Sequence, residues 1–197
     1  LIDGGFFKRK FKERTGKIAT ANDVENEVTR IMDAVRDKSG ANEQDFLFRV
    51  YYYDCCPFGG TIKKPNGGGE MDFSATKSYP ATENMLRELK QKERFAVRLG
   101  ELSFDGWETV VDTDDKGETR VDYKPKLKQK GVDMKVGLDM ALMALKHLVD
   151  KVVLVAGDSD FIAPMKFARK EGILVYLYSM GHRVKHQLTE HCDYKLS

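Results

Sequence analysis

The sequence has few of the residues that mark secreted, fibrous or membrane proteins. It contains three cysteines, five prolines and one tryptophan in 197 residues. The cysteines are Cys55, Cys56 and Cys192, an odd number with an adjacent pair, which argues against a disulfide framework and favours a reducing cytoplasm. No apolar run approaches the roughly 20 residues that a bilayer crossing needs. No signal peptide is recognisable at Leu1, so we expect neither membrane insertion nor export.

A strong net charge is also lacking, because 33 Lys and Arg residues stand against 31 Asp and Glu residues, giving +2. Attraction of nucleic acid to the whole molecule is therefore weak, and any such binding must come from local clusters of basic residues. Hydrophobic residues make up 41% and charged residues 32% of the chain. This balance predicts one folded domain over residues 1–197.

Hydrophobic periodicity predicts alternating strands and helices. Strands are expected at residues 1–2, 46–53, 95–104, 152–156 and 173–178. Helices are expected at residues 22–39, 82–91, 132–148, 161–171 and 183–192. An N-x-x-E pattern at Asn22 and Glu25 resembles a capping box at the start of the first helix. The alternation predicts an α/β fold with a doubly wound, mainly parallel sheet, whose ligands bind beyond the carboxyl ends of the strands.

Two segments depart from this alternation. Pro and Gly residues are frequent around residues 55–80, which predicts a long mobile loop inserted after the second strand. Residues 95–124 contain turn signals at Asp105-Gly106 and at residues 115–117, flanked by alternating segments. They predict a small antiparallel β excursion from the main sheet.

Aspartates follow two of the predicted strands directly. Asp3 follows the first strand, and Asp158 and Asp160 follow the buried strand at residues 152–156. The helix at residues 132–148 adds Asp133 and Asp139, which are about 1.7 turns apart and cannot both point straight at one ion. We favour Asp139 as a direct metal ligand, and Asp133 as a ligand or a residue just outside the ligand shell.

Crowded carboxylates repel one another, and a divalent cation is the simplest way to neutralise them. A set of oxygen ligands suits Mg²⁺ or Mn²⁺ rather than zinc. Four of the aspartates also have an ordinary explanation. Asp158 or Asp160 could cap the following helix, Asp133 could be a favourable acid in the first turn of its helix, and Asp139 could simply face solvent.

Two basic runs lie beside these acids in the sequence. The first contains Lys8, Arg9, Lys10, Lys12, Arg14 and Lys17, and the second contains Lys124, Lys126, Lys128 and Lys130. They could bind the phosphates of a polynucleotide on either side of a cleaved bond, without sequence preference. A solvated surface is the alternative explanation of both runs.

Taken together, these motifs resemble the NYN domain family, in particular its LabA-like bacterial branch, within the PIN-like nuclease superfamily. The resemblance runs nearly from end to end. Its carriers are residues 2–5 (IDGG), 49–54 (RVYYYD), 130–133 (KGVD) with Asp139, 157–161 (GDSDF), and Leu188 with Asp193.

The resemblance implies a PIN-like sheet of strand order 3-2-1-4-5 and a cytoplasmic endoribonuclease that depends on Mg²⁺ or Mn²⁺ and binds RNA. Asp3, Asp139 and Asp158 match the metal-binding acids of such folds. Asp133 and Asp160 match further acidic positions. Phe6 is a departure, because many family members have Asn at this place.

Other functions are also compatible with the sequence. A non-catalytic RNA- or protein-binding module with a vestigial acidic site is the main alternative. The D-x-D pattern at residues 158–160 also occurs in haloacid-dehalogenase phosphatases, which need it on the first strand, and in toprim domains, which need a glutamate there. His182, His186, His191 and Cys192 could suggest zinc, but an apolar stripe through Cys192 explains their spacing more simply. A homodimer is compatible with the sequence, which does not identify the RNA.

Overall fold

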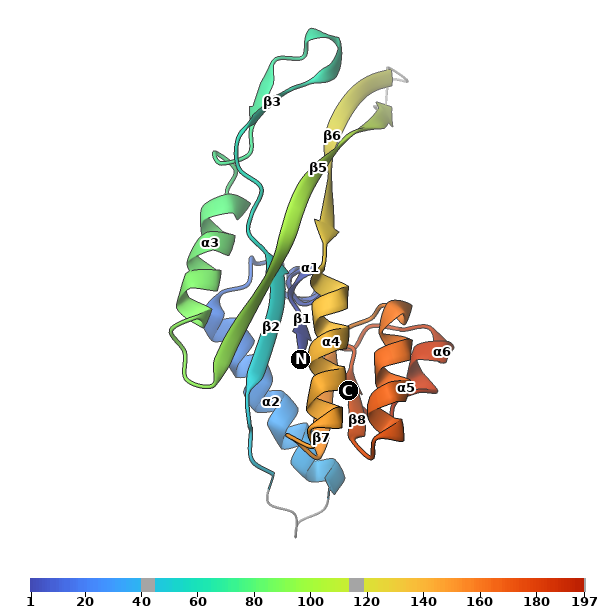
Figure 1. The fold of residues 1–197 in the computed structure, drawn as a ribbon. Helices are drawn as coiled ribbons and strands as arrows, with labels where there is room; N and C mark the ends of the chain where they lie inside the picture. The colour runs from blue at the N-terminus through green and yellow to red at the C-terminus, as the bar shows by residue number, and fades with distance from the viewer. Residues whose placement is uncertain (40–44, 114–118, 197) are drawn as a thin grey trace.

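The computed structural model describes residues 1–39, 45–113 and 119–196, and it shows one large twisted sheet with helices on both faces (Figure 1). The expected turn at residues 115–117 lies outside this range. Seven strands form the large sheet: β1 (Ile2–Asp3), β2 (Val50–Cys55), β5 (Phe95–Thr113), β6 (Thr119–Lys130), β7 (Lys151–Val155), β8 (Leu174–Tyr178) and β9 (Tyr194–Leu196).

The strand order of this sheet is β6-β5-β2-β1-β7-β8-β9. β5, β2, β1, β7 and β8 are parallel neighbours, so the expected fold class and the order 3-2-1-4-5 are confirmed. β9 extends the sheet in parallel beyond β8 and was not expected, whereas β6 runs antiparallel to β5. β1 lies at the centre, between β2 and β7, where the strand order switches.

Within the described ranges, six α-helices cover the two faces of the sheet. They are α1 (Gly4–Thr15), α2 (Ala21–Ser39), α3 (Ser78–Leu89), α4 (Val132–Leu145), α5 (Ile162–Lys170) and α6 (His186–Thr189). α1, α2 and α3 bury one core against the sheet, and α4, α5 and α6 bury another. Successive tyrosines of β2 alternate between the cores, with Tyr52 in the first and Tyr51 and Tyr53 in the second. The tyrosine run is therefore core packing.

The largest difference from expectation is the length of the antiparallel part. β5 continues through Asp105-Gly106, where the register shifts and the strand bulges instead of turning. Gly106 has a φ of 95°, which suits such a bulge. β5 and β6 therefore form a long ribbon that projects beyond the carboxyl ends of β1 and β2 (Figure 1).

The segment predicted as a long loop contains a hairpin of its own. β3 (Thr61–Lys63) pairs with β4 (Glu70–Asp72), with a short 3₁₀ helix at Pro65–Gly67 between them. This hairpin lies beside the β5–β6 ribbon (Figure 1). The insertion is therefore a second projecting arm of the molecule.

The ends of several elements also differ. α2 begins with a capping box between Thr20 and Asp23, because the Asp23 side chain accepts from Thr20 N at 2.9 Å and the Thr20 hydroxyl accepts from Asp23 N. The expected box at Asn22 is wrong by two residues. The last helix spans only His186–Thr189, and Phe46 and Phe48 are exposed ahead of β2. None of the described helices is long and apolar enough to cross a membrane.

One buried acid anchors α1 and α2 to the sheet. Glu27 is 2% exposed, and its carboxylate accepts hydrogen bonds from Arg14 at 2.7 and 3.1 Å and from the Tyr178 hydroxyl. Burial alone would raise the pKa of Glu27, but the hydrogen bonds from Arg14 and Tyr178 outweigh burial and lower it below 4.5. The charged form is therefore the stabilising one.

We expect Glu27→Gln to lower the free energy of unfolding by about 3 kcal/mol at pH 7, because one partner of a buried ion pair is lost. The depressed pKa means that the contribution of Glu27 is complete above its ordinary pKa and disappears as the pH falls through the folded-state value. Urea unfolding at several pH values should show the two proteins converging in acid. Glu25→Gln on the same helix removes an exposed pair with Lys92 and should cost about 1 kcal/mol or less. A pH-independent difference for Glu27→Gln would contradict this account.

Candidate active site

Asp3 ends the central strand and begins the first helix. Its Oδ1 accepts the Phe6 N–H at 3.1 Å, so the carboxylate caps α1. The helix can start at once because Gly4 has no side chain. A Cβ there would lie 2.7 Å from the Tyr53 carbonyl oxygen of β2. Half-buried Asp3 is thus held at the carboxyl edge of the sheet.

Asp158 repeats this arrangement after the neighbouring strand β7. Its Oδ1 accepts the Asp160 N–H at 3.1 Å and caps the 3₁₀ turn Ser159–Phe161. Asp160 is exposed within that turn and does not cap α5, which begins at Ile162. Two neighbouring parallel strands therefore each present one capping aspartate to the same edge.

Phe6 joins the two strand ends by packing. It is buried, and a Cβ on Gly157 would lie 2.5 Å from its ring. The other side of the Phe6 ring meets His182 edge to face, at 6.5 Å between centroids. Phe6 is therefore an apolar contact that holds the turn before Asp158 against α1.

The two acids of α4 lie in different surroundings. Asp133 is exposed in the first turn of the helix. Asp139 accepts the Tyr53 hydroxyl at 2.9 Å and the Arg98 Nε at 3.2 Å, both on Oδ2. Burial, and to a lesser extent the charge of Asp139, raises the pKa of Tyr53 far above its ordinary value. The phenol therefore remains the donor. Asp139 is thus engaged with β2 and β5.

Mutual repulsion identifies the acids that lie together. Burial, followed by the charges of Asp133 and Asp54, raises the pKa of Asp3. Burial, followed by the charges of Asp158 and Asp160, raises the pKa of Asp133. These five aspartates form the acidic cluster. Asp139, predicted as a direct ligand, is bound by Tyr53 and Arg98 in the structure, and its role as a ligand stays a prediction.

Asp54 was not among the candidate residues. It lies in β2 near its carboxyl end, 1% exposed, with Lys8 Nζ 2.6 Å from Oδ2 and the Cys55 N–H 2.8 Å from Oδ1. The sequence signal was available, since Asp54 ends an apolar strand as Asp3 and Asp158 do. Its partner Lys8 on α1 is 46 residues away in the chain, and nothing in the sequence predicts that these two side chains pair.

The donor set fits a hard divalent cation. All five side chains offer only carboxylate oxygens, and capping occupies one oxygen of Asp3 and of Asp158. Within the described residues, no three Asp, Glu, His or Cys side chains stand close enough to hold an ion. Mg²⁺ commonly keeps several waters and binds one or two carboxylates directly, so an open arrangement remains compatible with it.

The predicted basic residues divide into engaged and exposed ones. Lys8 pairs with Asp54, and Lys10 pairs with Glu13 at 2.6 Å. Arg9 is exposed on α1. On β6 the four predicted lysines alternate with other residues, so they share one face of the strand, and all four are exposed. Lys126 approaches Asp105 only at 3.7 Å.

The NYN domain family model matches residues 83–197, more than half of the chain. The match runs from α3 to the end of the sheet and includes the acids of α4 and those after β7, but it begins after Asp3 and Asp54. No curated protein and no solved structure matches the chain significantly. The LabA-like branch stays a prediction. With its PIN-like sheet and its acids at the switch point, the chain belongs to the NYN domain family, a family of nuclease-type RNA-processing domains in the PIN-like nuclease superfamily.

Proposed function

We propose that this protein is a metal-dependent endoribonuclease that hydrolyses RNA phosphodiester bonds at the acidic cluster. The observation that carries the proposal is the placement of Asp3, Asp133 and Asp158, three acids from separate elements, at the switch point of the sheet, where the charge of Asp133 raises the pKa of Asp3 and the charge of Asp158 raises the pKa of Asp133. Perturbed acids gathered at such a place are typical of functional sites. Membership of the NYN family supports the choice of RNA as the substrate.

Of Asp3, Asp133 and Asp158, one or two would bind Mg²⁺ or Mn²⁺ directly and the others through water molecules of the ion, with Asp160 beside them. When bound, such a cation neutralises charge on the phosphate and lowers the pKa of a water molecule. The caps of Asp3 and Asp158 fix the orientation of both carboxylates. Asp139 would act indirectly in this scheme, since its contacts with Tyr53 and Arg98 fix α4 on the sheet and thereby position Asp133.

The exposed lysines of β6 would bind the RNA backbone. Lys130 immediately precedes the Gly131 turn into α4, so the row leads directly to Asp133. A row of ammonium groups binds phosphates irrespective of base sequence. Arg9 on α1 lies in the same stretch of chain as Asp3 and could bind a phosphate on the other side of the cleaved bond.

The first test separates the acids. Asp133→Asn and Asp158→Asn should each lower RNA cleavage with Mn²⁺ or Mg²⁺ by about 100-fold or more and weaken Mn²⁺ binding in calorimetry, because each removes a ligand charge. Asp139→Asn should reduce thermal stability and leave Mn²⁺ affinity within a few-fold of the wild type. Equal loss of Mn²⁺ affinity in Asp139→Asn would instead make Asp139 a direct ligand. RNA binding in EDTA without cleavage in either metal would favour the non-catalytic binding module.

The second test concerns the lysine row. Replacing Lys126, Lys128 and Lys130 by Ala should weaken binding of single-stranded RNA and reduce the slope of log affinity against log salt by about 2, since each lost phosphate contact removes about 0.7. Fluorescence anisotropy at several salt concentrations measures both quantities. Replacing three exposed lysines near helix carboxyl ends, Lys38, Lys90 and Lys170, is the matched control. Equal slopes for the two triple variants would exclude the row as the RNA contact.

A further inference from the structure

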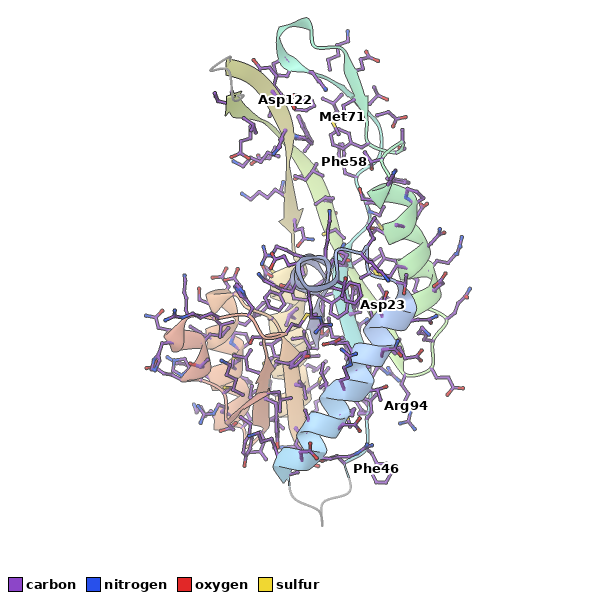
Figure 2. The ribbon with its side chains drawn as sticks, turned by 180° about the vertical axis from the view of Figure 1, so that it is seen from behind. Asp23, Phe46, Phe58, Met71, Arg94 and Asp122 are labelled. Atoms are coloured by element: carbon purple, nitrogen blue, oxygen red, sulfur yellow. The ribbon has the colours of Figure 1, made fainter. Side chains whose placement is uncertain are left out.

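A cavity of about 260 Å³ lies between the insertion, α3 and the β5–β6 ribbon, next to the acidic cluster. Phe58 and Met71 lie on the side of the insertion that faces the ribbon (Figure 2). Phe73 and Tyr79 contribute further aromatic surface, and Leu127 of β6 closes the opposite wall. The cavity is thus lined mainly by flat and apolar side chains.

Aromatic contacts hold the cavity walls together. The rings of Phe58 and Phe73 meet at 90° with centroids 5.0 Å apart. Both rings also reach Phe104 of β5, at 6.4 and 6.3 Å, and Phe104 meets Trp107 at 5.5 Å. This cluster fixes the insertion against the ribbon, so the space between them is a built feature of the fold.

Polar groups connect the cavity to the cluster. Gln129 lines the cavity, and its side-chain amide also lies over Gly5, where a Cβ would meet Gln129 Oε1 at 3.2 Å and Asp3 Oδ1 at 3.4 Å. Lys8 and Asp54 line the cavity as an ion pair, and the Asp54 charge acts on Asp3. A ligand in the cavity would therefore be adjacent to Asp3.

The alternation of β6 separates two kinds of contact. Pro125, Leu127 and Gln129 line the cavity, so the lysines between them lie on the opposite face of the strand. The cavity wall of β6 is therefore uncharged and suits a base, whereas the lysine face suits phosphates. The two faces meet at Gln129 and Lys130, next to the start of α4 and Asp133.

We propose that this cavity binds one nucleobase of the RNA, beside the phosphate that is cleaved, and that Gln129 reads the edge of that base. This inference rests on the proposed function. The cavity is smaller than the roughly 300–1,000 Å³ of pockets for drug-sized ligands, so it suits one base and not a run of nucleotides. The Gln129 amide lies at the cavity wall, and it offers both donors and an acceptor. Stacking of single-stranded bases on aromatic side chains is a general mode of RNA binding.

The test compares RNA with and without a base at a single position. A short single-stranded RNA and versions with one abasic site moved along it are titrated against the full chain in EDTA, which prevents metal-dependent cleavage. We expect one abasic position to weaken binding by about tenfold, the effect of one lost stacked base. Leu127→Trp, which fills the cavity, should bind intact RNA about tenfold more weakly and bind that abasic RNA as the wild type does.

Val121→Trp is the matched control, because Val121 is an exposed apolar residue on the same face of β6, farther along the strand. This variant should retain the difference between intact and abasic RNA. Gln129→Ala should retain the penalty of the abasic site and lose preference among the four bases at that position. An equal effect of Leu127→Trp on intact and abasic RNA would overturn the proposal, as would the absence of any sensitive abasic position.

The outcomes also distinguish this inference from the proposed function. Cavity-dependent binding in EDTA without cleavage in Mg²⁺ or Mn²⁺ would remove the ribonuclease activity and leave the base site supported. Cleavage that requires Asp158, together with equal binding of every abasic RNA, would support the nuclease and overturn the base site. A wild-type chain that binds no RNA would overturn both.

Discussion

The close approach of like charges at the carboxyl edge of the sheet is the constraint on which the rest of the site depends. β1 lies between β2, which carries Asp54, and β7, which Asp158 follows, so these acids reach the same edge of the sheet as Asp3. Backbone N–H groups compensate part of this charge, because Asp3 and Asp158 each cap the turn or helix that follows their strand. Lys8 compensates the charge of Asp54, which is buried. Asp133 gains no such partner within the described residues. A divalent cation would neutralise the negative charge that remains and would also attract the negative phosphate.

The family match and the sheet divide the molecule differently. The match begins at residue 83, whereas the sheet needs β1 and β2, which lie before it. Asp3, Lys8 and Asp54 therefore enter the site through topology, by pairing of β1 with β2 and β7. The insertion after β2 is also outside the match. It adds aromatic side chains beside a cluster that the parallel strands have already assembled, which is the usual way in which a common sheet acquires a particular specificity.

Much of the fold and part of the site could be predicted from the sequence. The apolar run at residues 152–156, followed by Gly157 and Asp158, identified a buried strand and its terminal acid, because burial and turn chemistry are local properties. The Lys8–Asp54 pair and the Arg98 contact of Asp139 could not be predicted, because each joins residues far apart in the chain. The turn expected at Asp105-Gly106 was wrong for another reason. The dipeptide suits a turn, but continued pairing of β5 with β6 turned it into a bulge.

The β5–β6 ribbon offers a substrate two different surfaces. A strand has two faces, and β6 uses one for lysines and the other for the cavity wall, so a single element can present charge and an apolar surface without mixing them. A polynucleotide has the same division between phosphates and bases. Both faces of β6 converge where the strand enters α4, which brings Gln129 beside Gly5 and Lys130 two residues before Val132. The acids lie at this convergence. An RNA strand that contacts both faces of β6 would therefore place the phosphate that lies between these two contacts close to Asp3 and Asp133.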